Sequence, residues 1–528
     1  MLRERVRNRL LRRADWRFLL PNPCPARSVC LAGGPLAKAV GLISSQVIPP
    51  DAAAGADCDL AVTVDPDELA LRAAWDALAP GGICYSEWYA PLVGGAHRVR
   101  QRIEAAGFDN VTCYWSWPPP VLAPAQLWLP IEAVGATRYV LNTYPRGEQA
   151  VTRLARRIGP AVWPSVWRTG LLRPVCAVAC KPASACAKPV EPLRSIVDNW
   201  AEWGLGRPPD QLSWLLLTGG PRTISKPVGL VFAEPDSRPR LAVKYSRVPE
   251  AGPKLQREAD GLRATHALRP GGVPGVPRLL FNRERDGVRA VGETAVVGQL
   301  LYLRLRRDNY GELALRATDW LAHLAGRAEP QPPATWWDRL VGSVLDGFEA
   351  TFGGVVDPRA VARTRSILRG LGPLPLVIEQ RDFSPWNVLV CPSGDLAVLD
   401  WESSEPRGLP LLDLLYLLGY LTFDLAHVSG SSARFAEAYR ASLDPTSFSG
   451  RVRAECLERY LRLTGLDPAA VNPLRLLVWL VHTRSDYEHL VADYAGQPAA
   501  AALRASLFLT LWRAELDAVS RDGSCARA

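Results

Sequence analysis

Apolar and polar positions in the first third of the chain alternate between strand-like and helix-like stretches. Strand-like stretches, rich in apolar and β-branched residues, recur at residues 27–32, 59–65, 82–88, 111–115 and 173–181. Helix-like stretches lie between some of them, at residues 67–78 and 97–106. Alternating strands and helices are typical of a doubly wound sheet. The pattern therefore predicts a Rossmann-like α/β domain over residues 21–182.

The rest of the chain combines short strands with long helical stretches. Three strand patterns and one helical pattern follow in order, at residues 214–217, 229–232, 241–244 and 255–262. The last third is mostly helical, with stretches at residues 453–463, 474–488 and 499–519. Residues 183–210 are rich in Pro and small residues, which is typical of a linker. With 528 residues, the chain is long enough for two or three domains.

A group of polar positions in the last third carries the clearest chemical signal. Asp382 and Asn387 lie five residues apart on a segment rich in turn residues, and two apolar strands follow at residues 388–390 and 396–399. These strands predict a hairpin, directly followed by Asp400, that brings the three side chains together. In phosphoryl transfer, one carboxylate takes or orients the proton of the attacking hydroxyl. An Asn oxygen and a second carboxylate hold Mg²⁺ against the phosphates of ATP.

Arg381, Asp382 and Asn387 match the catalytic motif of the aminoglycoside phosphotransferase and choline kinase-like family, which this part of the chain resembles. That family has the protein kinase fold. The resemblance implies a bilobal α+β domain, with an N-lobe at residues 211–298 and a helical C-lobe at residues 299–528. It also implies that Asp382 is the catalytic residue.

In the same resemblance, Asn387 and Asp400 are the Mg²⁺ ligands. Gln380 stands where the family usually has a His that braces the catalytic loop, and we expect Gln380 to brace it through hydrogen bonds. Asp413 belongs to a sequence that resembles the family's Gly-x-Pro-x-x-Asp-Leu continuation. We expect Asp413 to be a buried hydrogen-bond acceptor with a structural role.

The resemblance also implies nucleotide-binding residues upstream. Lys244 ends an apolar strand and matches the lysine that binds the α- and β-phosphates of ATP. Glu258, on the helical stretch that follows, matches the glutamate that pairs with this lysine. Gly219 and Gly220 lie in a turn between two strands, a lid whose backbone N–H groups can approach phosphates. Residues 293–298 resemble the hinge between the lobes, whose backbone would pair with adenine.

The α/β domain resembles the late half of a class I S-adenosylmethionine-dependent methyltransferase. The match is clearest at residues 105–111, where Ala-Gly-Phe precedes a strand. The segment that binds the cofactor in that family matches this sequence less well. Gly33 and Gly34 follow the first strand without an acidic residue, and Asp51 is the nearby candidate for the carboxylate of a second strand that is short or absent. We interpret the domain as degenerate, with its cofactor lost.

The composition bears on which partners the chain could bind and on the cellular compartment in which it folds. The net charge is +9, and Arg is concentrated in residues 1–20. We expect this basic leader to be a solvated helix, with weak contact to an anionic surface as the alternative. The net charge is compatible with nucleic acid as a partner, but we assign no nucleic-acid or membrane partner. The sequence has neither a run of 18 apolar residues nor a secretory signal. The 11 Cys, without metal-ligand spacing, indicate reduced thiols in a cytoplasm.

Together these features predict an ATP- and Mg²⁺-dependent O-phosphotransferase that acts on a hydroxyl of a sugar, an amino sugar or a similar metabolite. Two alternatives stay open. One is a catalytically inactive pseudokinase that serves as a scaffold, since Gln380 replaces the usual His. The other is a methyltransferase whose kinase-like domain is regulatory. The retained carboxylate, amide and lysine positions favour the phosphotransferase.

Overall fold

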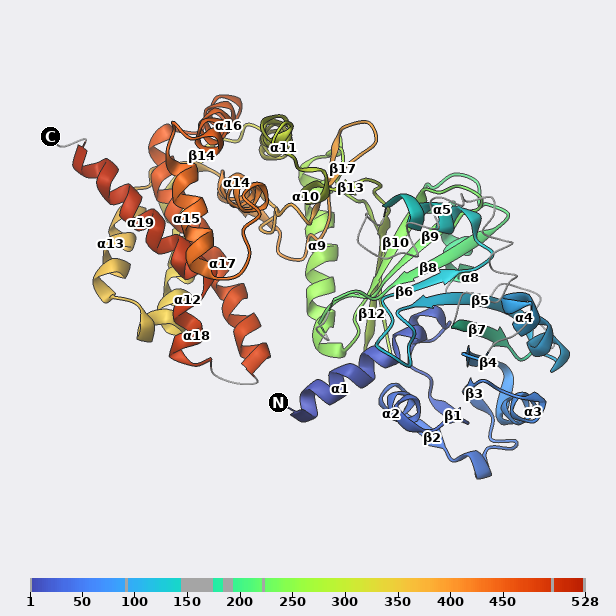
Figure 1. Ribbon diagram of the computed structural model, residues 1–528. Coiled ribbons are helices and arrows are strands. Elements are labelled where there is room, and N and C mark those ends of the chain that lie inside the picture. Colours follow the sequence, from blue (N-terminus) through green and yellow to red (C-terminus); the bar gives the residue numbers. More distant parts are fainter. Residues whose placement is uncertain are drawn as a thin grey trace. The chain divides into compact units, whose positions relative to one another are not determined.

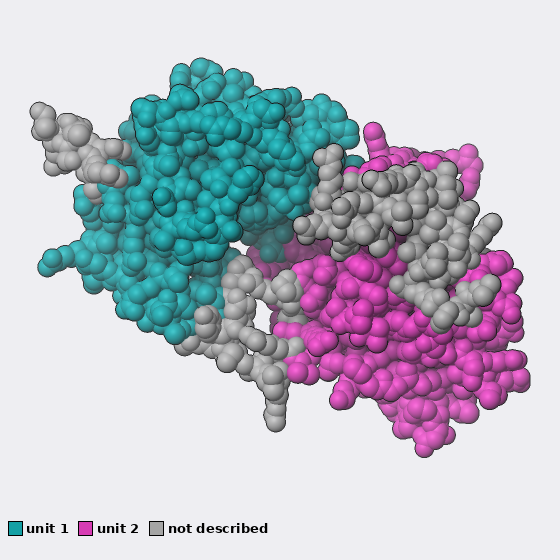
Figure 2. Space-filling model, viewed as in Figure 1, with its two compact units in different colours: residues 1, 260–277, 297–528 teal, residues 2–259, 278–296 magenta. Residues whose placement is uncertain are grey.

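The computed structural model describes residues 2–90, 94–143, 174–183, 193–220, 224–494 and 498–525. The chain divides into two compact units, coloured separately in Figure 2. The sheet unit comprises Leu2–Ala259 and Arg278–Val296, and the helical unit comprises Asp260–Pro277 and Val297–Ala528. The division crosses helix α9 (Gly252–Leu268), so that Glu258 belongs to the sheet unit and the second half of the helix to the helical unit.

The sheet unit is built around one mixed sheet, which has 12 strands within the described residues (Figure 1). Its order is β11-β12-β10-β9-β8-β6-β5-β7-β4-β3-β1-β2. In chain order the strands are β1 (Arg27–Cys30), β2 (Gln46–Ile48), β3 (Cys58–Val64), β4 (Leu78–Trp88), β5 (Asp109–Trp117), β6 (Leu127–Pro130), β7 (Val175–Cys180), β8 (Leu212–Leu217), β9 (Val228–Ala233), β10 (Pro239–Tyr245), β11 (Leu279–Arg285) and β12 (Val288–Thr294).

Helices cover both faces of the first part of this sheet. Alternate residues of β3 point to opposite faces, so Ala61 joins one apolar cluster while Leu60 and Val62 join the other. The Ala61 cluster includes residues of α3 (Glu68–Ala77), α4 (Gly95–Ala105) and α5 (Val134–Thr143). The other cluster includes residues of α2 (Gly34–Ile43) and α8 (Leu193–Asn199). Strands β1 to β4 are parallel, and β7 is antiparallel to both β4 and β5.

The sheet continues beyond the boundary expected at residue 182. Strand β6 pairs with β8, so the strands of the expected α/β domain and those of the expected N-lobe share one sheet. Part of the expected linker is also folded, because it contains α8 and the buried Trp200. Residues 184–192 of that linker lie outside the described residues. Apolar side chains such as Ile196 and Trp200 explain the difference, since they pack into the core.

The Arg-rich leader differs from the expected solvated helix. Helix α1 (Leu2–Arg13) is followed by a buried 3-10 turn, Asp15–Leu19. The Asp15 carboxylate accepts two hydrogen bonds from the Arg247 guanidinium, at 2.8 and 3.0 Å, and Arg17 donates to the Arg247 carbonyl oxygen. Apolar residues between the arginines also pack into the core, among them Trp16, Phe18, Leu19 and Leu20. This part of the leader is therefore a component of the sheet unit.

The helical unit contains, besides the end of α9, mostly helices with three small sheets. Its helices are α10 (Leu301–Arg304), α11 (Tyr310–Ala325), α12 (Ser343–Phe352), α13 (Pro358–Leu368), α14 (Leu412–Leu425), α15 (Ser432–Leu443), α16 (Phe448–Thr464), α17 (Val471–Tyr494), α18 (Ala500–Arg504) and α19 (Leu507–Cys525). Its strands are β13 (Gln299–Leu300), β14 (Pro330–Gln331), β15 (Leu374–Pro375), β16 (Val377–Glu379), β17 (Val388–Val390), β18 (Leu396–Val398) and β19 (Glu405–Gly408).

Helix α14 is the buried centre of the helical unit and packs against α11, α15 and α17. The last predicted helix, residues 499–519, is instead two helices, α18 and α19. They separate at Ser506, whose hydroxyl accepts from the Leu509 N–H at 3.3 Å and also bonds to Asp486. Among the described helices, none combines the length and apolar character that crossing a membrane requires.

Candidate functional site

The predicted hairpin is present in the helical unit. Strands β17 and β18 are antiparallel, with Val388 opposite Val398, and Gly394 closes the turn with a positive φ of 89°. The loop that carries Asp382 and Asn387 connects β16 to β17. Asp400 follows β18 and has a φ of 60°, a left-handed conformation that non-glycine residues rarely adopt outside turns and functional sites.

The hairpin and the loop bring the three predicted residues together. The Asn387 side-chain amide donates to the Asp382 carboxylate at 2.8 Å and to the Asp382 carbonyl oxygen at 3.0 Å. The Asn387 amide nitrogen is therefore engaged by Asp382. The Asp400 carboxylate is close enough for its charge to act on Asp382. One carboxylate, one amide oxygen and a second carboxylate thus lie around one loop.

Gln380 braces this loop, as expected from its place in the motif. Its side-chain nitrogen donates to the carbonyl oxygens of Leu399 and Asp400, at 3.1 and 2.6 Å. Its side-chain oxygen accepts from the Asp382 N–H at 2.8 Å. The residue is fully buried. A single side chain therefore ties the backbone of Asp382 to the backbone of Asp400.

Asp413 has the structural role that the sequence predicts. Its carboxylate accepts hydrogen bonds from the backbone N–H groups of Gln380 and Arg381, at 2.7 and 2.8 Å. Arg381 has a φ of 66°, and its side chain donates to Glu379 at 3.1 Å. These contacts hold the start of the loop in a conformation that costs about 1–3 kcal/mol.

Burial and charge make Asp382 an unusually weak acid. Burial, together with the charge of Asp400, raises the pKa of Asp382 to about 8, although the hydrogen bond from Asn387 acts in the opposite direction. A carboxyl group with a pKa near neutrality can take or hold a proton at working pH, which is typical of catalytic sites. A cation bound beside Asp400 would reduce the repulsion and favour the ionised form of Asp382.

An aromatic wall beside Asp382 was not predicted from the sequence. We define it as Tyr416 and Tyr420 of α14, Trp386 of the loop and His482 of α17. Tyr416 stacks on His482 with ring centres 3.8 Å apart, and Trp386 meets the Tyr420 ring at 4.7 Å, edge to face. Burial, then Tyr420 and Asp382, raise the pKa of Tyr416 well above its usual value. Trp386 is 42% exposed, which is unusual for so large an apolar ring.

Two predicted nucleotide-binding residues form an ion pair in the sheet unit. Lys244 lies on β10 and Glu258 on the first half of α9, and their side chains are in contact. Both residues are buried. Two further residues join them: Lys226, which was not predicted, contacts Glu258 at 3.0 Å, and Glu293, the first residue of the predicted hinge, contacts Lys244 at 2.8 Å through its side chain.

The two predicted glycines follow β8 in the same unit. Gly220 has a φ of 85°, and a Cβ atom there would come within 2.4 Å of the Ser225 hydroxyl oxygen. The turn therefore needs glycine at this position. Gly219 has open space around it. Residues 221–223 of the predicted lid lie outside the described residues.

Two carboxylates lie near the carboxyl ends of the parallel strands. Asp51 lies in an exposed 3-10 turn, Pro50–Ala52. Glu87, in β4, is fully buried, and its carboxylate accepts hydrogen bonds from Arg13 of α1, from Tyr85 and from Tyr89, at 2.5 to 2.9 Å. Side chains of the same unit thus supply hydrogen bonds to the Glu87 carboxylate.

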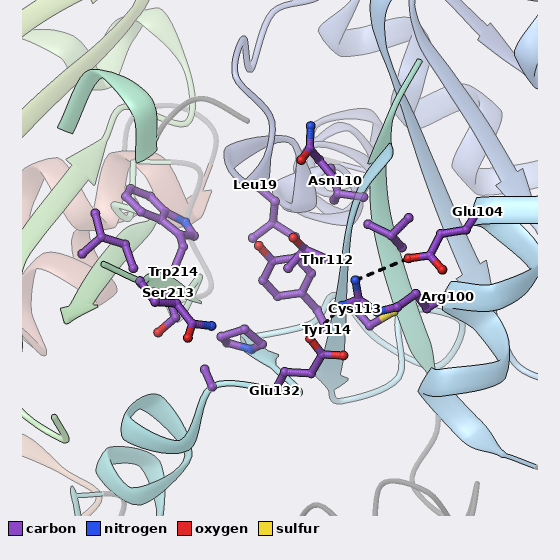
Figure 3. Close-up of a pocket in the computed structure, with 16 residues that line it drawn as sticks. Leu19, Arg100, Glu104, Asn110, Thr112, Cys113, Tyr114, Glu132, Ser213 and Trp214 are labelled. Carbon is purple, nitrogen blue, oxygen red and sulfur yellow. Dashed lines mark hydrogen bonds and ion pairs between the residues drawn. The ribbon is translucent and has the colours of Figure 1, made fainter. Parts of the chain in front are cut away.

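The sheet unit also contains a cavity of about 490 Å³, shown in Figure 3. Trp214 and Ser213 of β8 lie across the cavity from Arg100 and Glu104 of α4. Its charged groups are paired with one another: Arg100 bonds to Glu132 at 2.8 Å and to Glu104 at 3.8 Å. The predicted nucleotide-binding residues of this unit do not line the cavity.

A Mg²⁺ site of the predicted kind fits the residues present. Within the described residues, no group of three or more His, Cys, Asp or Glu could hold a metal ion. Mg²⁺ is, however, commonly bound through one or two protein side chains together with substrate phosphates and water. The Asn387 Oδ1 atom and the Asp400 carboxylate have the hard oxygen chemistry that Mg²⁺ prefers.

No family model matches the chain, and no curated protein matches it. Among solved structures, the chain is similar to the aminoglycoside phosphotransferase APH(4)-Ia, at 16% identity over 61% of this chain and 99% of that one, with a TM-score of 0.35. It is similar to APH(3'')-Id from Streptomyces rimosus, at 14% identity over 55% and 96%, with a TM-score of 0.32.

The chain is also similar to a Haemophilus somnus protein described as a fructosamine-3-kinase, at 12% identity over 60% of this chain and 97% of that one, with a TM-score of 0.37. These three structures are of phosphotransferases and kinases that act on small molecules. At such identities and TM-scores the likeness carries no argument about activity, which must come from the chain's own side chains.

Proposed function

We propose that the chain is an ATP- and Mg²⁺-dependent O-phosphotransferase that acts on a hydroxyl group of a small-molecule acceptor. The observation that carries the proposal is the loop in which Gln380 ties Asp382 to Asp400 while Asn387 donates to Asp382. This loop holds a carboxyl group of raised pKa next to two oxygen ligands. Phosphoryl transfer needs this combination, because its catalysis consists mainly of positioning and charge stabilisation.

Each polar side chain of the loop has a distinct task in this proposal. Asp382 orients the acceptor hydroxyl and receives its proton. Asn387 and Asp400 present their oxygens to Mg²⁺, which would neutralise charge on the phosphates of ATP. Gln380 and Asp413 keep the loop in place. In the sheet unit, Lys244, positioned by Glu258, binds the phosphates through its ammonium group.

The aromatic wall indicates which kind of acceptor molecule the site would bind. An acceptor hydroxyl that reaches Asp382 would lie beside Tyr416 and the exposed Trp386. Aromatic faces pack well against the C–H faces of sugar rings and against alkyl groups. The wall therefore favours an acceptor that carries such an apolar face next to the hydroxyl that receives the phosphoryl group.

ADP release with a panel of sugars, amino sugars and amino alcohols tests the proposal. We expect turnover by the unaltered chain, no turnover but retained ATP binding in Asp382→Ala, and weaker Mg²⁺-dependent ATP binding in Asp400→Ala. Asp308→Ala, at an exposed position of the helical unit, is the matched control and should keep full turnover. Equal, normal turnover in all three variants would rule out the assigned roles.

A further inference from the structure

Strand β6 is too short to fill the space between its two neighbours in the sheet. It has four residues, whereas β5 has nine and β8 has six. After Pro130 the chain turns into α5, and the Ala133 N–H donates back to the Pro130 carbonyl oxygen at 3.2 Å. In the described part of the chain, no strand therefore separates residues 109–112 of β5 from residues 212–214 of β8. The cavity of Figure 3 lies in this space, since residues from both stretches line it.

The two strands that border the cavity direct backbone groups into it. In an antiparallel sheet, every second residue of a strand turns its N–H and C=O groups toward the same neighbour. On β5, the Cys113 carbonyl oxygen accepts from the Ile131 N–H, one residue beyond β6, at 2.9 Å, so the groups of Val111 face the cavity. On β8, the Thr218 N–H donates to the residue before β6, so the groups of Leu212 face it from the other side. Strands that flank a third lie about 10 Å apart, which leaves room for one more strand.

The two faces of the cavity differ in chemistry. On one face the lining includes Tyr114 and Trp214, which belong to the same apolar cluster. On the other, α4 supplies Arg100 and Glu104, and Arg100 bonds to Glu132 beyond the end of β6. These are the charged residues that line the cavity, so its lining carries one more negative charge than positive. The Glu104 and Glu132 side chains are 50% and 67% exposed, which leaves both carboxylates accessible to a ligand.

We infer that this cavity binds an extended peptide of a partner protein, in which apolar and basic side chains alternate. The peptide lies as a strand between β5 and β8, antiparallel to both as β6 is. Successive side chains of a strand point to opposite faces, so the apolar ones meet Tyr114 and Trp214 and the basic ones meet Glu104 and Glu132. In strand addition of this kind, main-chain hydrogen bonds provide affinity and alternate side chains provide specificity.

The polar groups at the cavity favour a peptide over a small polar molecule. Several polar side chains of the lining are already engaged: the Ser213 hydroxyl donates to Glu234 at 2.6 Å, and the Cys113 thiol donates to the Ala96 carbonyl oxygen at 3.8 Å. The groups that both strands direct into the cavity belong to the backbone. A ligand that has a peptide backbone of its own matches them on both sides.

Fluorescence anisotropy of labelled synthetic peptides with the full chain tests the inference. The probe is Val-Lys-Val-Lys-Val, acetylated and amidated so that its ends carry no charge, and we expect saturable binding. Methylation of the central backbone nitrogen, which removes one hydrogen-bond donor, should weaken binding at least tenfold. Val-Val-Val-Lys-Lys, which has the same composition and charge without the alternation, should also bind at least tenfold more weakly.

An exchange of charges between peptide and protein shows whether the probe binds in this cavity. We expect the double variant Glu104→Lys, Glu132→Lys to bind Val-Lys-Val-Lys-Val at least tenfold more weakly and to bind Val-Glu-Val-Glu-Val, which the unaltered chain rejects. Asp76→Lys, at an exposed position of α3 outside the cavity, is the control and should keep the original preference. Thermal unfolding of each variant confirms that the sample is folded.

Three results would each overturn the inference. They are no saturable binding by the unaltered chain, equal binding of the methylated peptide, and an unchanged preference in the folded double variant. The residues that line the cavity include none of those assigned to phosphoryl transfer. The double variant should therefore bind MgATP as the unaltered chain does, and failure of the proposed function would leave this inference standing.

Discussion

At the scale of single residues, Asp382 shows how the fold sets the chemistry of a side chain. Its ordinary pKa is 3.8, and burial with the charge of Asp400 raises it to about 8. A carboxyl group with a raised pKa in the folded state binds its proton more tightly there than in the unfolded chain. Its contribution to stability is therefore full below pH 4 and is lost as the pH rises through 8.

Replacing the Asp382 carboxyl group by an amide, which does not titrate, should remove this loss of stability at high pH. In the absence of Mg²⁺ and nucleotide, we expect Asp382→Asn to be more stable than the unaltered chain at pH 8.5 by about 3–5 kcal/mol, since each unit of the pKa difference corresponds to about 1.4 kcal/mol. At pH 4 the two should differ by less than about 1 kcal/mol, because the carboxyl group is then protonated in the folded chain and about half protonated in the unfolded chain. Urea denaturation at both pH values measures the difference. Asp308→Asn should show no such dependence, and an equal effect of the two variants would contradict the assigned cause.

Gln380 allows a test of the loop that changes very few atoms. In Gln380→Glu a carboxylate oxygen replaces the side-chain nitrogen that donates to the carbonyl oxygens of Leu399 and Asp400. The new carboxylate oxygen would then face two carbonyl oxygens in a buried site, and none of these atoms can donate a hydrogen bond. We therefore expect a loss of about 2–4 kcal/mol of stability and reduced turnover. Gln101→Glu, on the exposed face of α4, should change neither. Normal stability and turnover in Gln380→Glu would show that the brace is unimportant.

At the scale of elements, the loop depends on close packing by the second half of α9. A Cβ atom at Gly261 would come within 2.0 Å of the Ser404 hydroxyl oxygen and within 2.9 Å of the Trp401 carbonyl oxygen. The helix therefore lies directly against the segment that follows Asp400. Glycine is needed at this position for space and not for its conformation, since its φ is not positive.

Gly261→Ala should consequently push this segment away from the helix. We expect it to destabilise the chain by about 1–3 kcal/mol, the usual cost of overpacking, and to lower turnover. The matched control is Gly347→Ala in α12, where a Cβ atom has open space. That variant should gain about 0.5–1 kcal/mol from the higher helix propensity of Ala. Equal effects of the two substitutions on urea denaturation would contradict the packing argument.

The elements near the loop could be predicted because their signals are local. The hairpin follows from two apolar runs around a turn, and the roles of Gln380 and Asp413 follow from their places in one motif. Partners distant in the sequence could not be predicted in this way. Lys226 and Glu293 meet the Lys244–Glu258 pair only after four separate elements fold together, and Tyr416 reaches Asp382 from a helix 34 residues further on.

At the scale of the whole molecule, the sheet unit shows where local patterns fail. Five strands of the first third, β1, β3, β4, β5 and β7, were predicted from their own apolar residues, whereas the short strands β2 and β6 were not. The pairing of β6 with β8 depends on strands more than 80 residues apart. The alternation of Arg and apolar residues in the leader likewise suggests a solvated helix. Burial of Asp15 with Arg247 becomes visible only once β10 is in place.

Calorimetric titration of the purified chain with ATP, with and without Mg²⁺, is the decisive test of the proposed phosphotransferase. We expect binding in the micromolar to millimolar range that is common for enzyme substrates, and we expect it to depend on Mg²⁺. Asp400→Ala should lose the Mg²⁺ dependence, whereas Asp382→Ala should keep it. Absence of ATP binding by a sample shown to be folded would rule out the proposed phosphotransferase and favour a scaffold without catalytic activity.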